Sequence, residues 1–213
     1  LSAVGIDLKE IRVVADEQDL IVEAIRALDS ALGGRYDLLF TSGGIGPTHD
    51  DVTADAVAEA FGVGIETNDD ALAVMRARWE ARGVPVTGNR LRMARIPLGA
   101  ELISNGVSAA PGFHLGNTYV MAGVPEVFRT MVDSILPTLP TGRPPVSESL
   151  EVHRGESDVA DDLKAMAEEY ADLSLGSYPW QRDGVYGTVL VVRGLDSDRV
   201  SAAMADLKQR IGA

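Results

Sequence analysis

The sequence predicts a layered α/β domain with helices on both faces of its sheet, followed by a smaller α+β domain. In the first two thirds of the chain, apolar runs of strand length alternate with amphipathic stretches of helix length. The segment "LPTLPTGRPP" (136–145) then interrupts this pattern with four prolines and a glycine. Beyond it the order becomes strand, helix, strand, strand, helix, which is typical of a small split α+β unit.

The first element is predicted as the last turn of a helix at residues 1–4, ended by Gly5 and followed by a strand over residues 10–14. No strand precedes that turn, so we expect upstream sequence that contributes to the domain. Asp16 is a suitable cap for the next helix, which Gly33 and Gly34 end. Its apolar residues recur every three or four positions, namely Leu20, Ile21, Ala24, Ile25, Leu28 and Leu32.

The middle of the domain continues the alternation. Residues 36–40, "YDLLF", form an apolar run expected of a buried strand, and residues 53–61 follow as a helix that Gly62 ends. Asn68 is a suitable cap for a further helix over residues 71–81. Strands are expected at 100–104 and 117–123, and Pro125 begins a helix that runs to about residue 136.

These patterns give a domain at residues 1–136, a linker at 137–145 and a small domain at 146–213. In the small domain we expect strands at 148–154, 173–180 and 186–194. Helices are expected at 158–170 and 196–211. An aromatic group in this domain favours core packing or a contact between subunits, and consists of Tyr178, Trp180, Arg182 and Tyr186.

The amino-acid composition excludes several classes of binding partner and of chemical site. The net charge of −13 argues against nucleic acids and anionic membranes, because both attract an excess of Lys and Arg. The absence of cysteine excludes disulfides, thiolate zinc sites and cysteine nucleophiles. No apolar run is long enough for a membrane span, and no signal-peptide pattern is present. The sequence therefore predicts a cytoplasmic protein with a small-molecule ligand, no nucleic acid and no membrane.

The segment "TSGGIGPTHDDVTADAV" (41–57) leaves a predicted buried strand and enters a helix, which is where open α/β domains bind ligands. Its glycines let backbone N–H groups approach an anion, its hydroxyl groups add donors, and the helix start adds positive dipole. The glycines are Gly43, Gly44 and Gly46, and the hydroxyl residues are Thr41, Ser42 and Thr48. No lysine follows the glycines and the spacing G-x-G-x-x-G is missing, so neither a P-loop nor a dinucleotide fingerprint is present.

Two aspartates follow in the same segment. Asp51 is a candidate helix cap, but Asp50 and Asp51 beside a phosphate-type turn also suit a divalent cation or the handling of a proton. His49 is more typical of a solvated or hydrogen-bonded residue than of a catalyst. It forms no metal-ligand spacing with His114 or His153.

Several segments together resemble the molybdopterin-binding domain family of molybdenum-cofactor biosynthesis. The branch with the greatest similarity contains the competence/damage-inducible CinA proteins and the molybdopterin-binding-like domain of eukaryotic FAD synthases. Besides the turn, the similar segments are "NRLRMARIPLGAELISN" (89–105), "APGFHLGNTYVMAGVPEVFRTM" (110–131) and "SLGSYPWQRDGVYGT" (174–188). In this family a first strand with a G-D-E-type motif, upstream of this chain's first residue, supplies an acidic residue to the pocket.

The resemblance implies a three-layer α/β/α domain whose pocket binds molybdopterin or an adenine nucleotide. It implies that the turn contacts phosphate and that Asp51 lies near a magnesium ion. If the protein is an enzyme, the resemblance implies that it uses Mg²⁺, or Mn²⁺ or Co²⁺ in its place. Gly123, Val124 and Pro125 match a second loop of the pocket, although such a segment alone is typical of a strand-to-helix connection. Arg90 and Arg92 are further candidates for an anionic ligand, with solvation or ion pairing as the alternative.

Three functions remain open on this basis. One is binding of molybdopterin or a nucleotide in cofactor assembly, by carriage or nucleotidyl transfer. Another is a divalent-metal-dependent pyrophosphatase acting on ADP-ribose or FAD, with Asp51 and Asp50 as candidate catalytic residues. The third is a binding module without catalysis. The family resemblance also implies self-association, and we expect a homodimer formed by the small domain.

Overall fold

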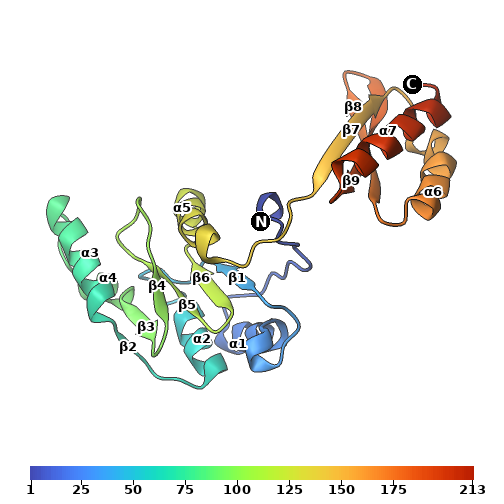
Figure 1. Ribbon diagram of the computed structural model, residues 1–213. Helices are drawn as coiled ribbons and strands as arrows, with labels where there is room; N and C mark the ends of the chain where they lie inside the picture. Colours follow the sequence, from blue (N-terminus) through green and yellow to red (C-terminus); the bar gives the residue numbers. More distant parts are fainter. The chain divides into compact units, whose positions relative to one another are not determined.

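The computed structural model describes residues 1–213 and divides into two compact units (Figure 1). The large unit is Glu10–Leu139, and the small unit joins Pro140–Ala213 with Leu1–Lys9. Each unit has its own hydrophobic core. None of the helices has both the length and the apolar character needed to cross a membrane.

The large unit is built on a four-stranded mixed sheet in the order β1-β6-β5-β4. β1 (Leu39–Ser42) pairs in parallel with β6 (Thr118–Met121), with Leu39 opposite Thr118. β5 (Gly112–Leu115) and β4 (Glu101–Ile103) extend the sheet antiparallel. A separate antiparallel pair joins β2 (Ile65–Thr67) to β3 (Arg95–Pro97).

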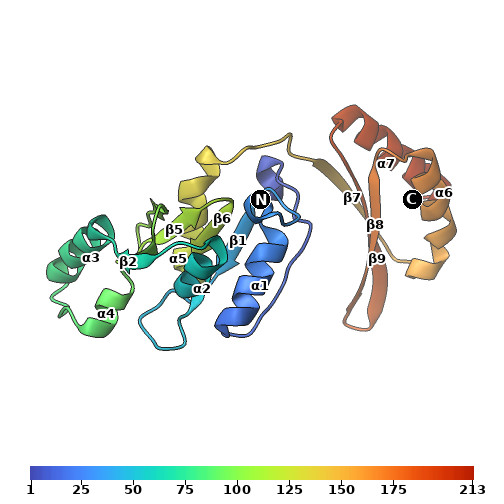
Figure 2. The ribbon, with the colours of Figure 1, turned by 90° about the horizontal axis from the view of Figure 1, so that it is seen from below.

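Helices cover both faces of the four-stranded sheet (Figure 2). α1 (Gln18–Leu28) and α2 (Thr53–Phe61) pack against each other and bury the face that carries Phe113 and Val120. α5 (Pro125–Ile135) lies on the other face, where Ala122 N donates to Met131 Sδ at 3.4 Å. The three-layer α/β/α arrangement is therefore confirmed. α3 (Asp69–Ala81) and α4 (Gly88–Arg92) lie between β2 and β3 in the chain.

Local sequence signals set the helix ends. α2 has the bounds that its apolar spacing predicts, and Gly62 follows it with a φ of +68°. The Asn68 side chain accepts a hydrogen bond from Ala71 N at 2.9 Å at the start of α3. Pro125 occupies the first turn of α5, as predicted. Short 3₁₀ turns occur at Ser2–Val4, Ser30–Leu32, Leu136–Thr138 and Glu156–Asp158.

Three predictions near the start of the chain are wrong. Residues 10–14 form no strand, because no neighbouring strand pairs with them, and Val13 is 93% exposed. The cap of α1 is Glu17 rather than Asp16, and it makes no side-chain capping bond. The strand expected at 36–40 begins only at Leu39, because Tyr36 forms a single bridge to Asp29 and its N–H donates to Leu28 O.

Asp29 joins α1 to the sheet. Its side chain is fully buried and accepts hydrogen bonds from Thr118 Oγ1 at 2.5 Å, Asn117 N at 3.2 Å and Ala31 N at 2.8 Å. A buried carboxylate is costly unless its oxygens are hydrogen-bonded. The donors of Asn117 and Thr118 therefore fix the end of α1 to the start of β6, and Ala31 N joins Asp29 to the 3₁₀ turn that follows α1.

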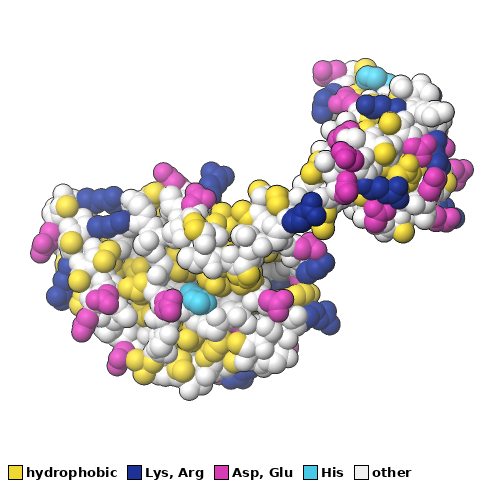
Figure 3. Space-filling model, in the orientation of Figure 1, with side chains coloured by type: hydrophobic (Ala, Val, Ile, Leu, Met, Phe, Trp, Pro, Cys, Tyr) yellow, Lys and Arg dark blue, Asp and Glu magenta, His cyan; other side chains and the backbone are white.

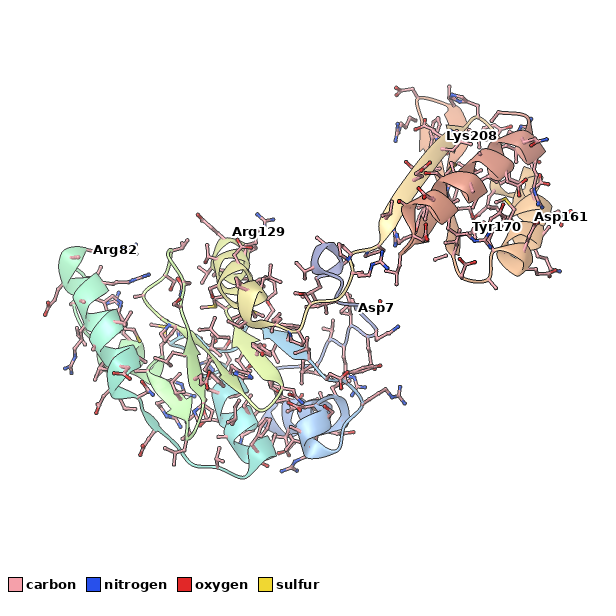
Figure 4. All side chains as sticks on the ribbon, viewed as in Figure 1. Asp7, Arg82, Arg129, Asp161, Tyr170 and Lys208 are labelled. Carbon is pink, nitrogen blue, oxygen red and sulfur yellow. The ribbon has the colours of Figure 1, made fainter.

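The small unit contains three antiparallel strands in the order β7-β9-β8, with two helices on one face. The strands are β7 (Val146–Val152), β8 (Ser174–Arg182) and β9 (Val185–Gly194), and the helices are α6 (Ala160–Glu169) and α7 (Ser197–Ile211). Tyr170, labelled in Figure 4, ends α6, and the Arg199 guanidinium lies 4.5 Å from the centre of its ring. Gly142 N donates to Val4 O, which ties the first residues to this unit.

The aromatic group of the small unit is only partly packed. The Arg182 guanidinium lies 5.0 Å from the centre of the Trp180 ring, and His153 meets that ring edge-on at 5.5 Å. Tyr178 and Tyr186 are exposed, so core packing is the wrong interpretation for these two side chains. Basic and acidic side chains are interspersed on the surface of both units in the view of Figure 3.

Replacing Asp29 with alanine tests the link between α1 and β6. We expect Asp29→Ala to lower the free energy of unfolding by about 2–4 kcal/mol, because it leaves buried donors of the sheet without an acceptor. Asp37→Ala, at an exposed position nearby, is expected to change it by less than about 0.5 kcal/mol. Urea unfolding followed by circular dichroism measures both, and equal effects of the two variants would contradict this role.

Candidate functional site

The glycine-rich turn begins where β1 ends. Gly43 and Gly44 have φ values of +104° and +69°, a region that side chains disfavour. Thr53 N, at the start of α2, donates to Gly44 O at 3.0 Å, and a Cβ atom on Gly44 would lie 2.0 Å from Thr53 Oγ1. Glycine at position 44 is therefore needed both for its backbone angles and for the close approach of α2.

The turn carries backbone donors that the protein does not use. Gly43 N donates to Met121 O at 2.9 Å and so belongs to the sheet. The N–H groups of Gly44, Ile45 and Gly46 make no hydrogen bond within the chain. Three consecutive free N–H groups next to a helix N-terminus form an arrangement that favours anions.

Asp51 turns its carboxylate back towards this turn. Its Oδ2 accepts hydrogen bonds from Thr48 N at 2.8 Å and Thr48 Oγ1 at 2.5 Å. A Cβ atom on Gly46 would lie 2.6 Å from the same oxygen. The residue that caps α2 is Val52, with no side-chain bond, so the interpretation of Asp51 as the helix cap is wrong. The side chain instead holds the turn closed and lies beside Gly46.

His49 and Asp50 lie at the exposed tip of the segment. The His49 side chain is fully exposed, and its Nδ1 is 4.0 Å from Asp50 Oδ1. Two hydrogen-bonding groups, first the Thr48 side chain and then the backbone N–H of Asp50, lower the pKa of the Asp50 carboxyl below its ordinary value. Asp50 therefore remains ionised at neutral pH and cannot supply a proton there.

A small recess opens beside the turn. Its walls carry turn and α2 residues on one side and residues of α4 and β3 on the other, with Pro111 and Phe113 also lining it. We call this site the recess, and its polar wall consists of Gly44, Gly46, Asp51, Asp55, Arg92 and Arg95. The space inside it that a water-sized molecule can enter is about 20 Å³. The recess therefore has room only for a group about the size of one water molecule or one phosphate oxygen.

Two arginines meet one carboxylate in the recess. Arg95 donates to both oxygens of Asp55, at 3.1 Å and 2.6 Å, in a bidentate pair. Arg92 Nη2 lies 3.5 Å from Asp55 Oδ2 and donates to Asp51 O at 3.3 Å. Arg92 was a sequence candidate, but Asp55 and Arg95 were not. The position of Asp55 in the first turn of the helix after the glycine-rich segment was the signal that could have indicated it.

The structure brings only some of the candidate residues together. Gly44, Gly46, Asp51 and Arg92 line the recess, with Thr48 bonded to Asp51. Arg90 donates to Pro85 O at 2.6 Å and does not line it.

The remaining candidates lie in β1, in the second loop and at the start of α5. A Cβ atom on Gly123 would lie 3.2 Å from Gly43 Cα, which places the second loop against the turn. Pro125 begins α5 after this loop. Thr41 Oγ1 is buried and lacks a hydrogen-bond partner, whereas Ser42 is exposed.

The donor set suits a cation only in part. No group of three or more histidine, aspartate or glutamate side chains is arranged to hold a metal ion. Asp51 offers one carboxylate beside the turn, with Oδ1 free of hydrogen bonds. Mg²⁺ in phosphate sites commonly uses one or two carboxylates and takes its other ligands from phosphate and water. The residues present fit a cation that arrives with a phosphate.

Alanine substitution tests the glycine-rich turn. We expect Gly44→Ala to lower the free energy of unfolding by about 2–4 kcal/mol, because backbone strain adds to the collision with Thr53. Gly83→Ala is the control, since Gly83 has a φ of +63° and open space around it, and we expect a loss of about 1 kcal/mol. Chemical unfolding measures the difference, and equal losses would show that crowding at Gly44 is unimportant.

Two families of known proteins match this chain, and the change from one to the other falls close to residue 140, where the large unit ends. Residues 1–141 match the family described as "Probable molybdopterin binding domain", and residues 144–213 match "FAD synthase, middle domain". A protein of Pyrobaculum arsenaticum is 38% identical over 189 residues, covering 84% of this chain and 69% of that protein. A protein of Metallosphaera sedula is 33% identical over 225 residues, covering 100% of this chain and 83% of that protein.

A solved structure is also similar. The crystal structure of the protein CinA with unknown function from Thermoplasma acidophilum has a TM-score of 0.50 and 32% sequence identity. The similarity covers 58% of this chain and 72% of that one. The chain therefore belongs to the CinA-like "Probable molybdopterin binding domain" family, and its C-terminal part matches the middle domain of FAD synthase.

Proposed function

We propose that the large unit binds a phosphate-bearing small molecule, either molybdopterin or an adenine nucleotide, at the glycine-rich turn. The observation that carries this proposal is the row of three free N–H groups at Gly44, Ile45 and Gly46 on the wall of the recess. Backbone donors of this kind bind phosphate without a lysine, and the N-terminus of α2 adds its dipole. The family supports a phosphorylated pterin as one such ligand.

A second candidate function is hydrolysis of a diphosphate bond, as in ADP-ribose or FAD. The observation that favours it is the Asp51 carboxylate, which lies beside the free N–H groups, where it would repel a phosphate unless a cation lay between them. A divalent cation bound there would polarise the phosphorus and promote attack by water. Asp51 would hold that cation, and Thr48 would hold Asp51 in place.

Turnover and binding assays separate these functions. The full-length protein is incubated with ADP-ribose, FAD and ATP, each with Mg²⁺, Mn²⁺ or Co²⁺, and release of AMP is followed. Calorimetry measures binding of the same ligands in parallel. Binding without turnover supports carriage of a ligand or a binding module without catalysis. Turnover supports hydrolysis of the diphosphate bond.

The matched variants are Asp51→Asn and Asp50→Asn. Both remove one negative charge, and the amide oxygen at position 51 still accepts a hydrogen bond from Thr48 N. We expect Asp51→Asn to reduce metal-dependent turnover about 100-fold or more, and Asp50→Asn to reduce it less than about 3-fold. If both variants lost the same activity, proximity to the turn would not distinguish Asp51. If wild-type protein bound none of these ligands and no molybdopterin, the proposed function would be wrong.

A further inference from the structure

The two arginines of the recess are held in different ways by the same carboxylate. Arg95 uses both terminal nitrogens on the two oxygens of Asp55, which is the strong fork-to-fork geometry. Arg92 makes one longer approach to Asp55 and one hydrogen bond to Asp51 O, both through Nη2. Its Nε and Nη1 donate to no protein group. Arg92 is therefore the guanidinium that can turn to a ligand without breaking the Asp55–Arg95 pair.

The location of Arg92 relative to the turn limits what it can contact. Its Nη2 donates a hydrogen bond to Asp51 O. The side chain of Asp51 in turn accepts a hydrogen bond from Thr48 N, within the same segment as the free N–H groups. Arg92 also lines the same recess as Gly44 and Gly46. If those N–H groups hold one phosphate of a ligand, the group of the ligand that lies near Arg92 would thus be the adjacent phosphate rather than a more distant part.

The charges of the recess agree with this reading. Two guanidinium groups share the Asp55 carboxylate, so this cluster of three side chains carries one net positive charge, which the Asp51 carboxylate elsewhere in the recess balances. The side chains of Asp55, Arg92 and Arg95 are 22%, 33% and 32% exposed, so they are shielded from solvent only in part and remain accessible. Asp55 brings together two like charges that would otherwise repel each other.

We propose that Arg92, positioned by Asp55, contacts a second phosphate, so that the recess selects ligands with two adjacent phosphates over ligands with one. This inference rests on the proposed binding of phosphate at the turn and names the class of ligand, a nucleoside diphosphate or its ester. Asp55 is a positioning residue that acts through Arg92, and Arg95 fixes Asp55.

Paired ligands that differ by one phosphate test the proposal. Calorimetry at constant ionic strength gives the dissociation constants of ADP and AMP, and of pyrophosphate and orthophosphate, with and without Mg²⁺. We expect wild-type protein to bind ADP about 10-fold or more tightly than AMP. Arg92→Gln is expected to bring that ratio to about 3-fold or less while affinity for AMP changes little. Arg90→Gln is the control, because Arg90 is a nearby arginine outside the recess.

The role of Asp55 has its own readout. Asp55→Ala is expected to reduce the ratio of ADP to AMP affinity, and Asp55→Glu, which keeps the carboxylate, to restore it in part. A purely structural role would lower the melting temperature and leave the ratio unchanged.

The outcomes separate the two levels of the proposal. If wild-type protein binds AMP and ADP but Arg92→Gln weakens both equally, or leaves the ratio unchanged, the second-phosphate contact is wrong and phosphate binding at the turn stands. If wild-type protein binds neither nucleotide, neither pyrophosphate nor orthophosphate, and no molybdopterin, the proposed function fails and this inference fails with it.

Discussion

The arrangement of the site depends on one close approach, in which the backbone of Gly44 passes over Thr53. The N–H of Thr53 donates to Gly44 O, and no side chain fits between them. This contact sets where α2 begins relative to the end of β1. Because Asp51 precedes α2 and Asp55 lies in its first turn, the same contact places both carboxylates at the recess. The glycines thus position the acidic residues as well as leaving N–H groups free.

The recess balances its charges within a strongly acidic protein. The chain carries a net charge of −13, yet the recess contains two aspartates and two arginines. Asp55 is engaged by Arg95, whereas Asp51 is held by the neutral Thr48 and keeps an open oxygen. One arginine and one carboxylate therefore remain for the proposed ligand and its cation. A divalent cation bound to a phosphate chain suits this pairing, since each charge of the complex meets its opposite.

Elements with strong local signals were predictable from the sequence. The apolar spacing and Gly62 define α2, and Asn68 marks the start of α3, because caps and helix stripes depend on neighbouring residues. The residues of the turn that line the recess were predictable in the same way. Residues 10–14 carry a strand composition but have no pairing partner, and partners depend on tertiary structure.

The far wall of the recess could not be predicted from local patterns. Asp55 and Arg95 are 40 residues apart and meet only because α2 packs near β3. The carboxylate of Asp51 also differs from the helix-cap interpretation, because its nearest donors lie in the turn rather than in the first turn of α2. Ion pairs between distant segments carry no short-range signal in a single sequence. The folded chain shows that Arg95 is paired with Asp55, whereas Arg92 keeps hydrogen-bond donors without a partner.

The most direct test of phosphate binding at the turn is an NMR titration that follows backbone amides as ADP and Mg²⁺ are added. We expect the resonances of Gly44, Ile45 and Gly46 to shift together and saturate, because their N–H groups are the free donors. Gly43 should shift less, since its N–H already bonds to Met121 O. Binding that left these three amides unchanged, or that shifted amides of the small unit instead, would contradict the account.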